Sequence, residues 1–287
     1  MARNMPADNA PLIRSVLHPT DFSKAGERAF AHALAISLFR QADFTILHVG
    51  EDSRDKVPWD RFPPVRKTLE KWGLLEEGSP QSAIYQEYQV RVRKRAVKSR
   101  NPALATTKYA EEYPADLLVV ATEGRQGLSR WIDRSDAEAM ARWTRTMTLF
   151  VPADSKREIV APEDGDLTLN NVLVPVDAEP DASTALEYAR RAAEIMGDGD
   201  VTITALHVGE TVMRDPEFED SDSINWRSEH RQGDPVDRIL EAAEDLKAEL
   251  IVMTTRGHDG LTDVLRGSTT EKVLRRASCP LLAVPAG

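Results

Sequence analysis

The sequence lacks the features of secreted and membrane proteins. It contains a single cysteine, Cys279, so no disulfide can form within the chain, and one free thiol suits a reducing compartment. No apolar run reaches the roughly 20 residues that span a membrane. The opening stretch MARNMPADNAP lacks the apolar centre of a signal peptide. We therefore expect a cytoplasmic protein that does not bind membranes.

Positive charge is also scarce. Asp and Glu number 47 against 37 Lys and Arg, which gives a formal net charge of −10 and argues against binding to nucleic acid. One basic stretch, VRVRKRAVKSR at 90–100, alternates charged and apolar residues as an exposed edge strand does, where lysine discourages aggregation. His48 and His207 each follow an apolar run outside any cluster of ligand residues, so we expect no metal site.

Four pairs of motifs recur in the same order. LHPTDFS at 17–23 matches LVPVDAE at 173–179, and ILHVGE at 46–51 matches ALHVGE at 205–210. Further on, ADLLVVATEGRQGL at 115–128 matches AELIVMTTRGHDGL at 248–261, and TLFVPA at 148–153 matches LLAVPA at 281–286. The chain is therefore a tandem duplication. We expect an N-terminal domain at 1–153, a linker at 154–168 and a C-terminal domain at 169–287.

The spacing between matched residues changes along the chain. His48 and His207 are 159 positions apart, whereas Gly124 and Gly257 are 133 apart, so the second copy is 26 residues shorter in between. In this interval the first copy has RFPPVRKTLEKWGLL, a plausible helix, and the second has the acidic TVMRDPEFEDSDS. We predict that the second copy lacks one crossover helix.

Within each copy, apolar runs of strand length alternate with helical patterns, which indicates an α/β fold with a parallel sheet and helices on both faces. Ligands bind such sheets at the carboxyl ends of the strands, where the strand order reverses. The loops to inspect therefore follow Pro175, His207, Met253 and Leu265. The elements predicted in the first copy are strands at Ser15–His18, Phe44–Val49, Tyr88–Val97, Asp116–Ala121 and Thr148–Val151, and helices at Lys24–Phe39, Pro64–Leu75, Ala103–Glu112 and Asp136–Arg145.

The stretch Val252–Pro285 reads as a strand, a loop bracketed by Gly257 and Gly267, a helix and a final strand. Ser268 stands at a helix cap with Glu271 three residues later. Unpaired amides at a helix start favour an anion, and glycine lets the backbone approach it closely. The same pattern also serves as an ordinary turn between a strand and a helix, so spacing alone leaves both interpretations open.

The loop resembles that of the universal stress protein family, whose pattern is G-x2-G-x9-G-[ST]. Gly257, Gly267 and Ser268 match it, and Thr254 stands where the first glycine is expected. With the duplicated motifs, nearly the whole chain resembles two such domains. The resemblance implies two Rossmann-like domains of the adenine nucleotide alpha-hydrolase-like fold, each a five-stranded parallel sheet of order 3-2-1-4-5. It also implies that the final strands pair across the copies, giving a pseudo-dimer within one chain and leaving a homodimer open.

One branch of this family binds ATP and another does not. In the binding branch, the aspartate ending strand one and the residue after the strand-two histidine hold the adenosine, and the glycine loop holds ribose and phosphates. The resemblance thus implies a nucleotide site at Pro175, Val176, Asp177, Val208, Met253, Thr254, Arg256, Gly257, His258, Gly267, Ser268, Thr269 and Thr270. The ligand expected is ATP or another adenine nucleotide, with Mg²⁺ accompanying ATP.

The first copy departs from this pattern. Asp21, Val49, Gly124 and Ser135 match site positions, but Arg134 replaces the second glycine of the loop. A bulky side chain at a close-approach position would block a phosphate, so we expect a degenerate site; a phosphate clamp made by the arginines of this loop is the alternative. Asp21 and Asp177 are also candidates for helix capping, Asp21 the better of the two.

We therefore expect a nucleotide-dependent regulator with an unidentified protein partner. No general base can be named from the sequence, so any ATP hydrolysis should be slow. A scaffold or adaptor that binds no nucleotide, and an enzyme acting on a nucleotide, are the rival functions.

Overall fold

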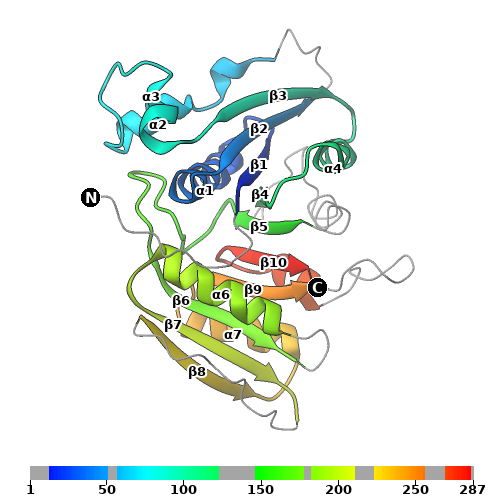
Figure 1. Ribbon diagram of the computed structural model, residues 1–287. Coiled ribbons are helices and arrows are strands. Elements are labelled where there is room, and N and C mark those ends of the chain that lie inside the picture. The colour runs from blue at the N-terminus through cyan, green and yellow to red at the C-terminus, as the bar shows by residue number, and fades with distance from the viewer. Residues whose placement is uncertain are drawn as a thin grey trace.

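The computed structural model describes residues 13–50, 57–122, 146–177, 182–210, 223–255 and 269–285. These residues form one ten-stranded sheet that runs the length of the molecule (Figure 1). The strands of the first half are β1 (Ser15–Thr20), β2 (Asp43–Gly50), β3 (Val92–Lys98), β4 (Leu117–Thr122) and β5 (Met147–Pro152). Those of the second half are β6 (Leu169–Val176), β7 (Gly197–Val208), β8 (Ile224–Arg231), β9 (Leu250–Thr255) and β10 (Leu281–Pro285).

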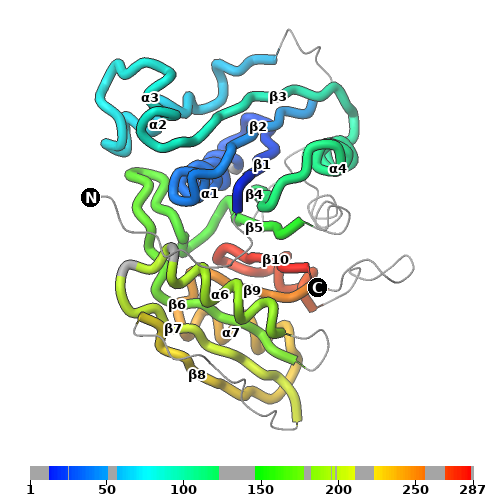
Figure 2. Tube along the Cα trace, viewed as in Figure 1, coloured from blue at the N-terminus to red at the C-terminus, as the bar shows by residue number. Residues whose placement is uncertain are grey.

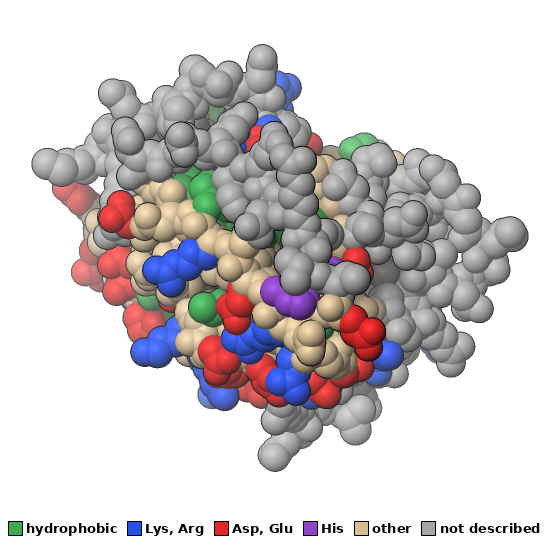
Figure 3. Space-filling model, turned by 90° about the horizontal axis from the view of Figure 1, so that it is seen from below, with side chains coloured by type: hydrophobic (Ala, Val, Ile, Leu, Met, Phe, Trp, Pro, Cys, Tyr) green, Lys and Arg blue, Asp and Glu red, His purple; other side chains and the backbone are tan. Residues whose placement is uncertain are grey.

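The strand order is β3-β2-β1-β4-β5-β10-β9-β6-β7-β8, so each half has the 3-2-1-4-5 order that the resemblance implies. The two halves occupy opposite ends of the sheet, as the chain trace shows (Figure 2). Strands β3 and β8 form the outer edges. Seen from the β8 side, the surface carries side chains of both charges (Figure 3).

Helices cover both faces of this sheet, as predicted. Buried residues of α1 and α6 belong to one hydrophobic cluster, and those of α4 and α7 belong to a second. The helices are α1 (Lys24–Arg40), α2 (Val65–Lys71), α3 (Ala83–Tyr88), α4 (Pro102–Glu112), α6 (Ser183–Met196), α7 (Pro235–Asp245) and α8 (Thr269–Leu274), with a 3-10 turn, η2 (Trp59–Arg61). None of the described helices is both long and apolar enough to cross a membrane.

The helices α4 and α7 begin in the same way. Asn101 accepts a hydrogen bond from the Leu104 amide at 2.9 Å, and Asp234 accepts one from the Asp237 amide at 3.1 Å. A proline occupies the first turn of each helix, where its missing N–H costs nothing. The duplication has thus kept the device that starts this helix in both halves.

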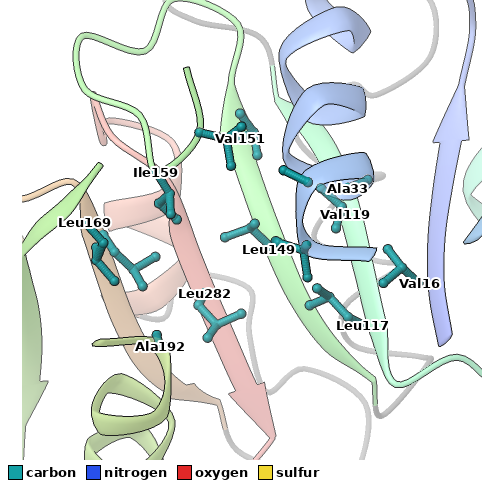
Figure 4. Packing of buried hydrophobic residues seen from close by; sticks show 14 of the residues in the cluster. Val16, Ala33, Leu117, Val119, Leu149, Val151, Ile159, Leu169, Ala192 and Leu282 are labelled. Atoms are coloured by element: carbon teal, nitrogen blue, oxygen red, sulfur yellow. The ribbon is translucent and has the colours of Figure 1, made fainter. Parts of the chain in front are cut away.

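The halves meet where β5 and β10 pair antiparallel, with Leu281 opposite Phe150 and Leu282 opposite Leu149. The pairing of final strands implied by the resemblance is therefore present. The hydrophobic cluster on the α1 and α6 face continues across this seam, where Leu149 of β5 lies near Leu282 of β10 (Figure 4). Neither final strand is left as an exposed apolar edge.

The segment 154–168, expected to be a linker, packs against both halves. Ile159 and Val160 are fully buried. Trp72, at the end of α2, donates from Nε1 to the carbonyl oxygen of Pro162 at 3.2 Å. Arg157 donates from Nε to the carbonyl oxygen of Ala248 at 3.0 Å in the second half. The domain boundaries 1–153 and 169–287 stay predictions.

Most predicted strands lie within one or two residues of those observed. The helix expected at Pro64–Leu75 is shorter than predicted, since α2 ends at Lys71. A strand was expected from Tyr88, but Tyr88 ends α3 and β3 begins at Val92. The helix expected at Asp136–Arg145 lies outside the described residues. The same holds for 211–222, where the second copy was expected to lack a helix, while α2 and α3 lie between β2 and β3 in the first.

Candidate functional site

In the second half, the strand order reverses between β6 and β9. The chain moves outward from β6 to β7 and β8 and then returns to β9 on the other side of β6. Asp177 directly follows β6, Val208 is the last residue of β7, and Thr254 lies near the end of β9. Because β7, β6 and β9 are parallel neighbours, these three residues lie at one edge of the sheet. Such a reversal point is where open α/β sheets bind ligands.

Thr254 has an unpaired hydroxyl at this edge. The residue is 7% exposed, and among the described residues its Oγ1 has no hydrogen-bond partner. The next hydroxyl, of Thr255, donates to the carbonyl oxygen of Val284 at 3.3 Å. A buried hydroxyl without a partner is unfavourable, so the orphaned oxygen of Thr254 is the group at this edge that a ligand would satisfy. The first half has Ala121 at the matching position and no hydroxyl there.

Two histidines hold the main chain on either side of Val208. His207 Nδ1 lies 3.3 Å from the carbonyl oxygen of Val176, and His230 Nε2 lies 2.8 Å from that of Gly209. Their rings stack with centroids 5.5 Å apart. A Cβ on Gly209 would come within 2.8 Å of the His207 ring, which explains why glycine follows in the repeated HVG motif. Sequence reasoning placed His207 at a strand end and missed His230, since only the pairing of β7 with β8 brings the two rings together.

The first half keeps this histidine with a different neighbour. His48 Nδ1 lies 3.1 Å from the carbonyl oxygen of Thr20, but its ring stacks on Phe22 with centroids 4.3 Å apart. Trp59 and Phe62 also pack against Phe22, at 5.4 and 5.7 Å between ring centroids. Four rings thus gather at the carboxyl ends of β1 and β2, the part of the first half that corresponds to the edge beside Asp177 and Val208.

The two aspartates are placed differently. Asp21 is half-buried, and its Oδ1 accepts a hydrogen bond from the Ser23 amide at 2.8 Å, so it stabilises the turn before α1. Ser23, rather than Asp21, is the N-cap residue of α1. Asp177 is exposed, and α6 begins only at Ser183 with Ala182 at its N-cap. The N-cap of α6 is thus not Asp177, and the segment near Pro180 that Asp177 was considered to cap lies outside the described residues.

The other predicted site residues fall into two groups. Val176 and Met253 are buried, Pro175 and Val208 are half-buried, and Thr269 and Thr270 open α8. In the first half, Val49 is fully buried. Several predicted site residues lie outside the described residues: Arg256, Gly257, His258, Gly267 and Ser268 in the second half, and Gly124 and Ser135 in the first, together with the arginines considered there as a clamp.

Other reactive side chains are buried. Burial raises the pKa of the Cys279 thiol to about 12, so it stays protonated, in keeping with the core position expected for it. Burial also lowers the pKa of His18 to about 4, and its Nδ1 lies 3.0 Å from the carbonyl oxygen of Val119. Across the described parts of the chain, no group of three or more histidines, cysteines or carboxylates could hold a metal ion.

Several known proteins are similar to this chain in sequence or fold. The sequence profile of the universal stress protein family matches residues 13–152 and 218–285. A universal stress protein of Mycolicibacterium smegmatis is 24% identical over 94% of this chain and 96% of its own length. One from Methanocaldococcus jannaschii is 27% identical over 42% of this chain and 84% of its own length. The crystal structure of a universal stress protein from Archaeoglobus fulgidus shares the fold, with a TM-score of 0.61, 18% identity and coverage of 96% of this chain and 99% of that one.

Proposed function

The chain belongs to the universal stress protein family, and on that premise we propose that its second half binds an adenine nucleotide at the edge formed by Asp177, Val208 and Thr254. The observation that carries the proposal is the buried, unpartnered hydroxyl of Thr254 at the reversal point of the strand order. A bound ligand would give this oxygen the hydrogen bond that the described protein residues do not supply.

Each of the three residues offers a distinct contact. The Asp177 carboxylate can accept two hydrogen bonds from ribose hydroxyls, or one from the adenine amino group. Val208 would act through its backbone, which the interactions of His207 and His230 with neighbouring carbonyl groups hold in place. The Thr254 hydroxyl would contact ribose or phosphate. The glycine loop around Gly257 and Gly267 would complete the phosphate site, with ATP and Mg²⁺ as its ligands.

In the same proposal, the first half binds no nucleotide and serves as a structural partner. Its aspartate, Asp21, is engaged in the turn before α1. Aromatic rings crowd its strand ends, and Ala121 replaces the threonine. Nucleotide bound in the second half would alter a surface that a regulatory protein partner recognises in the cytoplasm.

Matched substitutions in the two halves test this function. Asp177→Asn should weaken ATP binding about tenfold, because a hydrogen bond to a charged group contributes about 1.5–3 kcal/mol. Thr254→Ala, which copies the first half, should weaken it by a smaller factor. The control is Asp21→Asn, which should leave affinity unchanged. Isothermal titration with ATP, ADP and AMP measures all four proteins, and equal losses from Asp21→Asn and Asp177→Asn would refute the assignment.

A scaffold that binds no nucleotide is the second candidate, favoured by Thr254 itself, whose side chain fills a position where the family pattern has glycine. Heating the purified protein and identifying the released small molecules separates the two. One adenine nucleotide per chain supports the proposal, and none supports the scaffold. Steady turnover of ATP near the enzyme median of about 10 per second would instead indicate catalysis.

A further inference from the structure

The two outer edges of the sheet can be compared position by position, because β3 pairs with β2 as β8 pairs with β7. Arg95 lies opposite Leu47, and Glu229 lies opposite Leu206, so these two residues occupy matching positions. By the same register, Lys94 matches Ser228. The duplication therefore began with equivalent edges that now differ in charge.

The β3 edge carries positive charge throughout. Arg91, Lys94, Arg95 and Lys98 are all exposed. Of the basic residues in β3, only Arg93 forms an ion pair with a described residue, bonding the Asp43 carboxylate at 2.7 Å. This concentration of positive charge on β3 contrasts with the net charge of −10 of the whole chain.

The β8 edge carries charges of both signs, and its last arginine is paired with carboxylates. Arg231 donates to Glu229 at 2.6 Å and to Asp245 at 2.9 Å. On the face that carries this edge, side chains of both signs are interspersed (Figure 3). The basic character of β3 is therefore not a general property of edge strands in this fold.

The backbone of β3 also presents free hydrogen-bonding groups. The amide N–H of Phe44 donates to the carbonyl oxygen of Arg91, and the amide N–H of Ser99 donates to the carbonyl oxygen of Gly50. The backbone N–H and C=O groups of the odd-numbered residues in this stretch therefore point toward β2. Successive residues of a strand point their backbone groups to opposite sides. The N–H and C=O groups of Val92, Lys94, Ala96 and Lys98 therefore point outward, where no described strand pairs with them.

Charges lie on both faces of this edge. Lys94 sits over the Trp59 ring at 5.1 Å, on the face of α1 and α2. Arg95, the next residue, has its side chain on the opposite face. A strand laid along β3 would meet a cation on each of its own faces, so carboxylates on both faces would be matched as cross-strand pairs.

From this edge we propose that β3 is the docking site for an acidic, extended segment of a partner protein, which adds to the sheet as an eleventh strand. Main-chain hydrogen bonds to the outward groups would give affinity, and pairing of carboxylates with Lys94, Arg95 and Lys98 would give specificity. The net negative charge of the chain disfavours long polyanions such as nucleic acid and leaves a short acidic strand as the matching partner. The site is independent of the nucleotide edge in the second half.

The test uses a fluorescein-labelled octapeptide in which pairs of adjacent glutamates alternate with valine–threonine pairs, so that both faces of the extended peptide carry carboxylates. It is titrated by fluorescence anisotropy against the full chain. The expected result is saturable binding that weakens about tenfold in Arg95→Glu, because like charges then face each other. Arg227→Glu makes the same charge change at the exposed β8 edge and should leave affinity unchanged. Equal effects of the two substitutions would overturn the proposal.

A second pair of measurements tests strand addition itself. Ala96→Pro removes one outward N–H without breaking the β2 ladder, so it should abolish peptide binding while thermal melting stays near that of the parent protein. A peptide N-methylated at two adjacent central residues loses one N–H on each of its edges, so it should bind the unchanged protein much more weakly. Undiminished binding of that peptide, or tighter binding of a single-stranded oligouridylate than of the acidic peptide, would contradict docking by strand addition.

Discussion

Two buried histidines should make the fold sensitive to mild acid. His18 on β1 and His32 on α1 are both fully buried, and burial lowers the pKa of each from 6.5 to about 4. In the unfolded chain these rings bind protons near pH 6.5, whereas in the folded protein they stay neutral until about pH 4. Stability is therefore complete above pH 6.5 and is lost as the pH falls toward 4.

The size of this effect follows from the two pKa values. Between about pH 7.5 and 5, each histidine should lower the free energy of unfolding by about 2 kcal/mol, or about 4 kcal/mol together. Paired carboxylates affect stability at lower pH than these histidines do. A hydrogen bond from Arg190 lowers the pKa of Glu187 below 4.5, and one from Ser278 lowers that of Glu244. The stability that these two carboxylates contribute therefore disappears only below that pH. Between about pH 5 and 6.5, the change in stability therefore reports on His18 and His32 rather than on these carboxylates.

Urea unfolding at a series of pH values measures the effect. His18→Asn and His32→Asn each keep an N–H donor near the position of Nδ1 but cannot titrate. Each substitution leaves a cavity that lowers stability at every pH, so the slope of free energy against pH is the quantity to compare. Each variant should reduce that slope by up to about 1.4 kcal/mol per pH unit. An unchanged slope in the double variant would refute the assignment of acid sensitivity to these rings.

Three further outcomes follow from the packing. Gly165→Ala should destabilise more than Gly73→Ala in thermal melts, because both have positive φ but only at Gly165 would a Cβ meet the Trp72 ring, at 2.6 Å; equal losses would contradict the packing of segment 154–168. Phe150→Ala at the seam, 1% exposed, should cost about 3–5 kcal/mol in urea unfolding, and a loss below 1 kcal/mol would be inconsistent with a buried seam. Cys279 should resist thiol reagents until the protein unfolds, and prompt labelling of native protein would show that it is not buried.

The duplication made most of the architecture predictable. Motifs repeated in order fix two equivalent halves, and alternating apolar runs fix parallel strands, so the strand order followed once the family resemblance was recognised. The helix α3 escaped notice because a short helix leading directly into β3 has no pattern of its own. Contacts between side chains far apart in the sequence also could not be predicted from it. Nothing adjacent in sequence indicates that His230 stacks on His207, or that Phe22 stacks on His48.

The structure also separates the two halves more clearly than the sequence does. Asp21 and Asp177 occupy matching motifs, yet Asp21 accepts a hydrogen bond in a turn, whereas Asp177 stands six residues ahead of its helix. Thr254 carries a hydroxyl and a methyl group that Ala121 lacks, and only the structure shows that this hydroxyl is buried without a partner among the described residues. Such contrasts within one chain supply matched controls for every substitution at the proposed site.

Photolabelling tests the central claim most directly. The full chain is irradiated with 8-azido-ATP, with and without excess ATP, and the modified tryptic peptides are identified by mass spectrometry. The account predicts label, protected by ATP, in peptides of the second half that contain Asp177, Val208 or Thr254. Protected label confined to the first half, around Asp21 and Val49, would contradict it.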